Sequence, residues 1–275
     1  MKITVQDFTG IYEYQPFMQE LRQSATNKFA TNKFTNSTDI CWLDCTKIIG
    51  TDCYCDDEAI KGISELIDNA GTAPGIHFFD NGNYHYMSKL WTDRIQEPFT
   101  LIVFDHHPDM QPPRFGGILS CGGWVKEVLD NNKFIQNVII IGVKDELVET
   151  IREELSQSSE DKILDKVTFI KESEISHDVT LDSFVYRLSS NIYLSIDKDA
   201  LAPAYAATNW DQGSLSIEAL KAIIAKLAAE HKVLGVDICG ERSHDFEGDE
   251  HHTVQEADAI NNALNQELVK FLQNL

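Results

Sequence analysis

Two short motifs contain the side chains that most often bind metal ions in proteins. The first, DHHPD, occupies residues 105–109 after the apolar run TLIVF, and the second, DKD, occupies residues 197–199 after NIYLSI. In an extended chain residues 105, 107 and 109 lie on one face, and the proline at position 108 favours that conformation for the residue before it. One aspartate after a strand is commonly a helix N-cap or a solvated loop residue, but four converging carboxylates repel one another unless a cation lies among them. The motifs therefore predict a metal site.

The chemical nature of the ligands narrows the choice of metal. Carboxylate oxygens with one or two imidazoles suit Mn²⁺ better than Zn²⁺, Fe²⁺ or Mg²⁺. Such an ion lowers the pKa of a bound water, so the chemistry expected at this site is metal-assisted hydrolysis.

Each motif follows one of a series of short apolar runs that are rich in Val, Ile and Phe. Such runs are typical of buried strands, and they cover residues 40–43, 75–79, 100–104, 137–141, 167–170, 192–196 and 233–238. Amphipathic patterns between them predict helices over residues 57–69, 122–131, 146–156, 216–231 and 253–275, the last opened by a capping box of Thr253 with Glu256. The first nine residues mix Lys2, Gln6 and Asp7 with apolar side chains and are compatible with a turn or a strand.

Strands and helices in alternation predict a three-layer α/β/α fold around a central, mainly parallel sheet. Because α/β folds of about 250 residues commonly form one domain, we expect a single domain over residues 1–275. Ligands of parallel sheets bind at the carboxyl ends of the strands, where both motifs lie.

Charge and hydropathy exclude several classes of partner. The formal net charge of −21 works against nucleic acid as a partner, and no apolar run approaches the roughly 20 residues that span a bilayer. The first residues do not resemble a secretory signal.

Four of the six cysteines lie between positions 41 and 55 without the paired CxxC spacing of zinc sites. A small metal or redox site there stays open, although we favour reduced thiols in a cytoplasmic protein that acts on a small molecule.

The motifs resemble those of a known family. DHHPD resembles the ureohydrolase motif DAHxD, SIDKDALAP at residues 195–203 is similar to SxDxDxxDP, and WDQGSLS at residues 210–216 is similar to a segment that precedes a helix in that family. Ureohydrolases include arginase, agmatinase and formimidoylglutamase. The resemblance implies an arginase-like fold, two Mn²⁺ ions per subunit, hydrolysis of a C–N bond in a linear guanidino or amidino compound, and a homo-oligomer, trimer or hexamer.

The resemblance also implies the metal ligands. Asp105 and Asp197 fall on the bridging aspartates of the family, and the remaining ligands fall on His107, Asp109 and Asp199. For the sixth ligand we predict His85, which follows a strand, over His77, which lies within one. Four aspartates and two neutral histidines carry a charge of −4, which balances two divalent ions.

The groups that select a substrate match less well. The family's proton-shuttle histidine has no counterpart in residues 119–124, and Gly240 occupies the position of its guanidinium-binding glutamate. Glu241 takes that role only if the loop shifts by one residue, and Asp109 is a second candidate catalytic group that would orient a hydroxide or relay a proton. His106 either supports the site or packs under the sheet. The segment 244–252, with four acidic residues and three histidines, is either a replacement proton shuttle or a solvated loop.

Other functions compete with this reading. The DHH run resembles a class of phosphoesterases, which also need an upstream aspartate motif, and deacetylases of the same fold use one Zn²⁺. A metal-stabilised scaffold without activity is a third alternative.

The tandem ATNKF repeat at residues 25–34 predicts an exposed loop or helix extension, with an oligomer contact as an alternative.

Overall fold

The computed structural model describes residues 1–26, 40–71, 75–112, 116–158, 160–175 and 188–275. Most of the ATNKF repeat lies outside these residues. Eight strands form one sheet in the order β2-β1-β4-β10-β9-β5-β7-β8, and every adjacent pair is parallel. The strands are β1 (Ile3–Asp7), β2 (Ile40–Asp44), β4 (Ile76–Phe78), β5 (Phe99–Phe104), β7 (Ile135–Val143), β8 (Val167–Lys171), β9 (Asn191–Asp197) and β10 (Lys232–Cys239).

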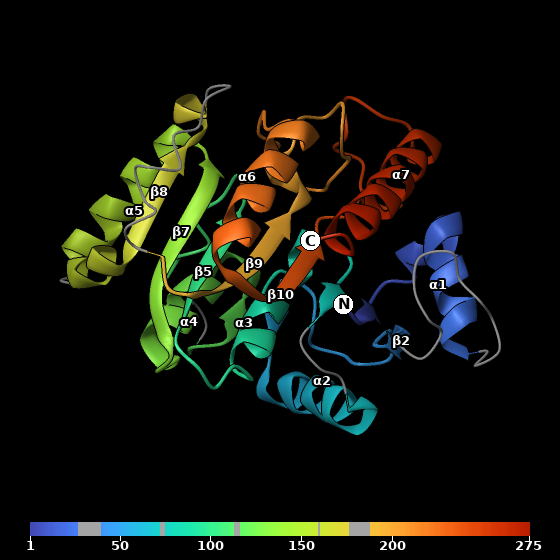
Figure 1. The fold of residues 1–275 in the computed structure, drawn as a ribbon, viewed down its shortest axis with the longest axis horizontal. Helices are drawn as coiled ribbons and strands as arrows, with labels where there is room; N and C mark the ends of the chain where they lie inside the picture. Colours follow the sequence, from blue (N-terminus) through green and yellow to red (C-terminus); the bar gives the residue numbers. More distant parts are fainter. Residues whose placement is uncertain (27–39, 72–74, 113–115, 159, 176–187) are drawn as a thin grey trace.

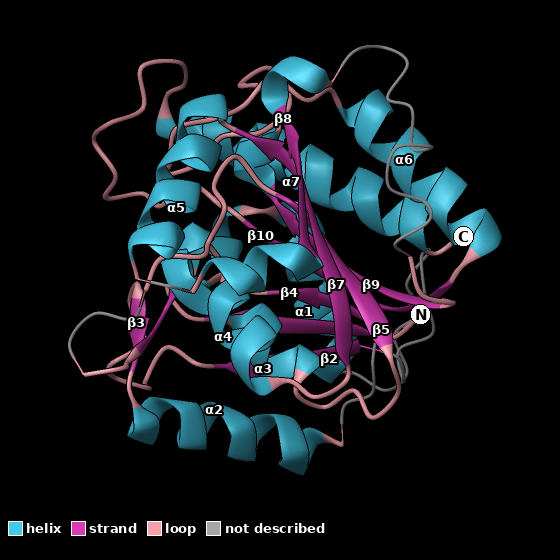
Figure 2. Cartoon of the chain, turned by 90° about the vertical axis from the view of Figure 1, so that its left-hand side faces the viewer, coloured by secondary structure: helices cyan, strands magenta, loops and turns pink. Residues whose placement is uncertain are grey.

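Helices cover both faces of the sheet (Figures 1 and 2). One apolar core joins it to α1 (Pro16–Thr26), α6 (Ile217–Glu230) and α7 (Val254–Leu272). A second core joins the other face to α2 (Asp57–Ala70), α3 (Met87–Thr92), α4 (Trp124–Asn131) and α5 (Asp145–Gln157). Because a strand directs alternate side chains to opposite faces, two-sided burial requires the nearly continuous apolar runs seen in the sequence. The prediction of a three-layer α/β/α fold around a parallel sheet is confirmed.

Local signals set the ends of the helices as expected. The Asp56 side chain accepts a hydrogen bond from the Ala59 amide at the start of α2, and Thr253 with Glu256 forms the predicted capping box at the start of α7. No helix in the described residues is long and apolar enough to cross a membrane.

A small antiparallel ribbon stands beside the main sheet. It pairs β3 (Tyr54–Cys55) with β6 (Leu119–Ser120). A short 3₁₀ helix, Cys121–Gly123, follows β6 and runs into α4. The ribbon thus ties the segment before α2 to the segment before α4, on the side of the molecule where β5 ends.

Candidate metal centre

The register of the sheet places the two aspartate motifs side by side. Phe104 at the end of β5 pairs with Ile196 of β9, so Asp105 and Asp197 leave adjacent strands at the same level. Cys239, the last residue of β10, pairs with Asp197 from the other side. Parallel strands bring their carboxyl ends to one edge of the sheet, and this edge collects residues that are far apart in the sequence.

His85 lies at the centre of three carboxylates. Its Nδ1 is 3.0 Å from Asp109 Oδ2, 3.1 Å from Asp105 Oδ2 and 3.4 Å from Asp197 Oδ2. Its other ring nitrogen, Nε2, lies 2.8 Å from Ser195 Oγ, which fixes the orientation of the ring. One ring N–H cannot form good hydrogen bonds to three oxygens at once, so the protein alone leaves these carboxylates incompletely satisfied.

His107 forms the second half of the site. Its Nδ1 lies 3.0 Å from Asp199 Oδ2 and 3.5 Å from Asp105 Oδ1. Its Nε2 lies 2.9 Å from Oδ1 of Asp211, which also pairs with Lys144. Asp105 therefore faces both histidines, with one oxygen toward each.

Asp109 is held by the start of α4. Its Oδ2 accepts a hydrogen bond of 2.7 Å from Trp124 Nε1, and its carbonyl oxygen accepts one of 3.0 Å from the Val125 amide. Its φ of 46° is left-handed, which few residues other than glycine adopt. Such conformations persist where surrounding contacts enforce them, so Asp109 is fixed in an uncommon backbone conformation to reach His85.

The electrostatics of the cluster favour a cation. Burial, with the charge of Asp199, raises the pKa of Asp197 to about 7, and burial with the charge of Asp105 raises the pKa of Asp199. Burial lowers the pKa of His85, but the nearby carboxylates of Asp105 and Asp109 outweigh it and raise that pKa well above its usual value. Burial and like charges thus raise the pKa values of both carboxyl groups, and the neighbouring histidines oppose this only in part.

The residues present fit a pair of divalent ions. Oδ2 of Asp105 is buried without a hydrogen-bond partner among the described residues, although His85 Nδ1 is near it. Two groups of potential ligand atoms, each within 4.8 Å of one another, share Asp105: His85 with Asp105 and Asp109, and His107 with Asp105 and Asp199. A third such group joins His85 and Asp197 to Cys239, a cysteine that the sequence motifs did not mark. Its Sγ lies 3.2 Å from Asp197 Oδ2.

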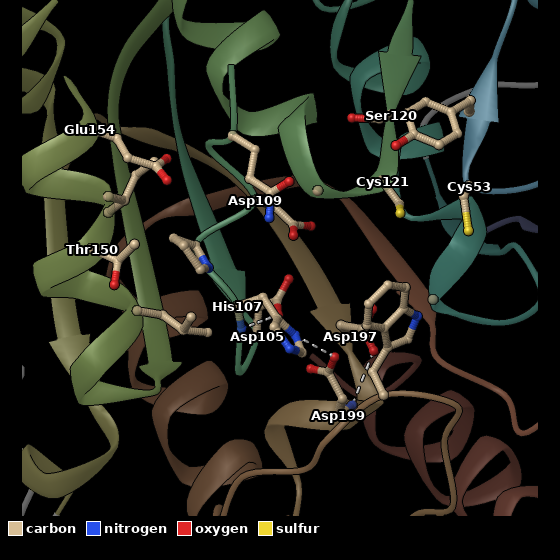
Figure 3. Close-up of a pocket in the computed structure, with 18 residues that line it drawn as sticks. Cys53, Asp105, His107, Asp109, Ser120, Cys121, Thr150, Glu154, Asp197 and Asp199 are labelled. Carbon is tan, nitrogen blue, oxygen red and sulfur yellow. Dashed lines mark hydrogen bonds and ion pairs between the residues drawn. The ribbon is translucent and has the colours of Figure 1, made fainter. Parts of the chain in front are cut away.

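A cavity of about 260 Å³ opens beside the cluster. The motif residues form its floor, and α5 forms a wall with Leu147, Thr150, Ile151 and Glu154. Figure 3 shows Thr150 and Glu154 on one side of the labelled aspartates and Cys53 and Cys121 on the other. No lysine or arginine is among the described residues that line it, so its charged groups are carboxylates and His107.

Glu241 and His106 do not line this cavity among its described residues. The carboxylate of Glu241 is fully buried and forms an ion pair with Lys198. It also accepts hydrogen bonds of 2.8 Å from Gln15 and Asn265. The ring of His106 is buried, with Nδ1 3.3 Å from the Gly142 carbonyl oxygen and Nε2 3.8 Å from Asp211. Glu241 is thus already paired within the chain, and His106 packs beneath the site.

The other histidines considered as a metal ligand or proton shuttle lie outside the aspartate cluster. His77 is buried within β4, with Nδ1 2.8 Å from Asp237 Oδ1 and its ring stacked on Trp91, as expected for a core histidine. His244 pairs with Asp258 through Nε2, and no histidine of segment 244–252 is among the lining residues of the cavity.

Comparison with known proteins agrees with these motifs. The family model "Arginase family" matches residues 82–257. The chain belongs to the arginase family. A Thermotoga maritima protein described as uncharacterized is 28% identical over 240 residues, which are 87% of this chain and 79% of that protein. The predicted resemblance to ureohydrolases, as a divergent member, is confirmed.

Solved structures share the arginase-family fold at low sequence identity. A proclavaminate amidino hydrolase from Streptomyces clavuligerus is 17% identical with a TM-score of 0.62, covering 100% of this chain and 92% of that one. A Trypanosoma cruzi formiminoglutamase determined with Mn²⁺ is 12% identical with a TM-score of 0.61, covering 99% of this chain and 93% of that one. An agmatine ureohydrolase from Thermoplasma volcanium is 17% identical with a TM-score of 0.59, covering 99% of this chain and 89% of that one. At these identities the likeness is one of fold.

Proposed function

We propose that this chain is a divergent arginase-family hydrolase that binds two Mn²⁺ ions and cleaves a C–N bond of a small linear amidino or guanidino compound. The observation that carries the proposal is the position of His85 Nδ1, within 3.0–3.4 Å of three carboxylate oxygens from two strand ends. We assign His85, Asp105, Asp109 and Asp197 to one ion and His107, Asp105, Asp197 and Asp199 to the other.

Two bound divalent ions supply Lewis-acid polarisation of the substrate and a water activated near neutral pH. The protein supplies the rest. Asp109, fixed by Trp124, is positioned to accept or hold a proton at the cavity floor, and Ser195 keeps His85 in the orientation that directs Nδ1 at the aspartates. The apolar side chains of Leu147 and Ile151 exclude water from one wall.

Substrate selection rests on the cavity and not on β10. A Cβ on Gly240 would lie 2.4 Å from Asp197 Oδ1, so a glutamate at that position cannot be accommodated unless the metal-site loop shifts. Glu241 is directed away into its pair with Lys198. The carboxylate that faces the cavity from α5 is Glu154, and it favours a substrate whose distal end is positive.

The direct test is turnover with added Mn²⁺. Arginine, agmatine, guanidinobutyrate, formiminoglutamate and simple amides would be assayed for release of urea or ammonia. We expect at least one amidino or guanidino compound to be hydrolysed, with the rate lost on chelation and restored by Mn²⁺. Hydrolysis of an acetyl-lysine peptide or a phosphodiester, with none of these substrates, would contradict the proposal.

One observation favours a second candidate, a metal-binding scaffold. His107, itself an assigned ligand, is the only histidine among the described residues that line the cavity. Those lining residues therefore include no second imidazole that could transfer protons. Two bound Mn²⁺ ions without turnover of any compound in the panel would support this alternative.

A further inference from the structure

Two cysteines face one another in the wall of the cavity. In the ribbon Tyr54 pairs with Ser120 and Cys55 with Leu119 in antiparallel register. The next pair in this register is Cys53 with Cys121, and the Cys121 amide donates a hydrogen bond of 2.9 Å to the Cys53 carbonyl oxygen. Both cysteines are half-buried free thiols, and both line the cavity that holds the aspartates. Figure 3 shows the two sulfur atoms on the same side of the cavity.

The backbone register of this pair is compatible with a disulfide. Directly opposed residues in an antiparallel pair have Cα atoms about 4.5–5.5 Å apart, within the range of about 4.4–6.8 Å that disulfides span. The two side chains also influence each other in the reduced state, since the neighbouring Cys121 thiol lowers the pKa of Cys53. A lowered thiol pKa favours the thiolate, which is the reactive form.

We propose that Cys53 and Cys121 are an oxidation site, at which a hydroperoxide converts the two thiols to a disulfide in the wall of the metal cavity. The Cys53 thiolate attacks the peroxide, the O–O bond breaks, and a sulfenic acid forms with release of an alcohol or water. The Cys121 sulfur then attacks the Cys53 sulfur, the S–S bond forms, and water leaves with the Cys121 proton. The two thiols lose two electrons, which reduce the peroxide.

Oxidation at this position bears on the metal cluster. Cys121 begins the 3₁₀ turn that enters α4, and the next residues hold the proposed ligand Asp109 through the Trp124 indole and the Val125 amide. The Gln111 amide also donates to the Gly122 carbonyl oxygen. Bringing the Cys121 sulfur to bonding distance of the Cys53 sulfur therefore acts directly on the segment that supports Asp109. This consequence rests on the proposed function, whereas disulfide formation does not.

The experiment treats the full-length protein with hydrogen peroxide and follows it by intact mass and peptide mapping. We expect a loss of about 2 Da, from two thiol hydrogens, a Cys53–Cys121 linked peptide, and reversal by dithiothreitol. The Cys53→Ser and Cys121→Ser variants should lose the linkage. Cys41→Ser, a half-buried cysteine outside the cavity lining, should keep it.

Calorimetric titration with Mn²⁺ then compares the reduced and oxidised wild-type proteins. We expect affinity at one of two sites to fall about tenfold on oxidation, as when an outer support of a metal ligand is lost. A linkage that joins other cysteines, or thiols that oxidise singly, would overturn the oxidation site whether or not the protein is an enzyme. An unchanged affinity for Mn²⁺ in the linked protein would overturn its coupling to Asp109.

Discussion

Buried carboxylates lie in two regions at the carboxyl ends of the strands, and the two regions differ in how the negative charge is balanced. At the end of β10, Glu241 is fully buried and paired with Lys198, and Gln15 and Asn265 complete its hydrogen bonds. At the ends of β5 and β9, four aspartates converge with no lysine or arginine paired to them in the described residues. A buried charge is tolerated only with a partner. The first region contains its own cation, whereas in the second we propose that bound metal ions supply the positive charge.

Lys198 shows the difference between the two regions clearly, because it lies between two of the aspartates in the sequence. Its backbone belongs to the metal motif, but its ammonium group is fully buried beside Glu241. The protein thus places a cation within two residues of the cluster and directs it away.

The largest effect is expected from Asp197→Ala. Its Oδ2 lies 3.4 Å from His85 Nδ1, and its Oδ1 accepts the Asp199 amide at 3.0 Å, so the change removes a carboxylate assigned to both ions and loosens the neighbouring ligand. We expect both Mn²⁺ ions to be lost and turnover to fall by about a thousandfold, or about 4 kcal/mol of transition-state stabilisation. Metal analysis and kinetics test this. Undiminished occupancy in the folded variant would sink the bridging assignment.

The next effect separates the two halves of the cluster. His85→Ala should reduce the stoichiometry from two Mn²⁺ to one, because it removes the nitrogen at the centre of three carboxylates. His106→Asn is the matched control, since that buried ring contacts Gly142 and Asp211 and not the cavity. We expect the control to retain two ions in calorimetric titration. Loss of metal in both variants would mean that the His85 result reports only damage to the fold.

Breaking the pair at β10 should affect stability more than metal binding. Lys198→Met leaves the Glu241 carboxylate buried without its cation, and loss of one partner of a buried pair costs about 3–5 kcal/mol. Urea unfolding of the metal-free protein measures this cost. Glu241→Gln combined with Lys198→Met should recover part of it, and each folded variant should still bind two Mn²⁺. If Lys198→Met instead loses its metals without loss of stability, the two regions are not distinct.

The sequence predicted most of the strands and aspartates at this end of the sheet, because the patterns that indicate them lie within a few consecutive residues. Apolar runs locate seven strands, and aspartates immediately after two of them locate the metal motifs. For β1 the sequence is compatible with either a turn or a strand, because Gln6 and Asp7 interrupt the apolar pattern. In the structure both side chains are buried, and Gln6 accepts a hydrogen bond from the Trp91 indole. A polar residue that is satisfied by a distant partner cannot be identified from its neighbours in sequence.

Contacts between distant segments were the part that the sequence did not reveal. The pairing of Lys198 with Glu241 depends on the β9–β10 register and on the turn at Gly240, whose φ of 97° suits glycine. The opposition of Cys53 and Cys121 depends on an antiparallel ribbon of two short strands. Neither two-residue strand has a periodicity that could be recognised in advance.

The smallest effect concerns Asp7, at the end of β1 on the same edge, which has neither a metal nor a lysine beside it. Burial raises the pKa of Asp7 to about 6, despite a hydrogen bond from the Gly10 amide. The folded protein therefore holds this proton more tightly than the unfolded chain, so folding stability falls as pH rises from about 4 through about 6. Asp7→Asn should then stabilise the metal-free protein by about 1–3 kcal/mol at pH 8 and by almost nothing at pH 4.

Urea unfolding in chelator at both pH values measures this difference without any contribution from bound metal. Asp44→Asn is the matched control, because Asp44 ends the neighbouring strand β2 and hydrogen bonds from Thr46 lower its pKa. That variant should show no gain at pH 8. An equal gain in both variants would indicate relief of the overall negative charge. A gain confined to Asp7→Asn would mean that burial is what destabilises the Asp7 carboxylate.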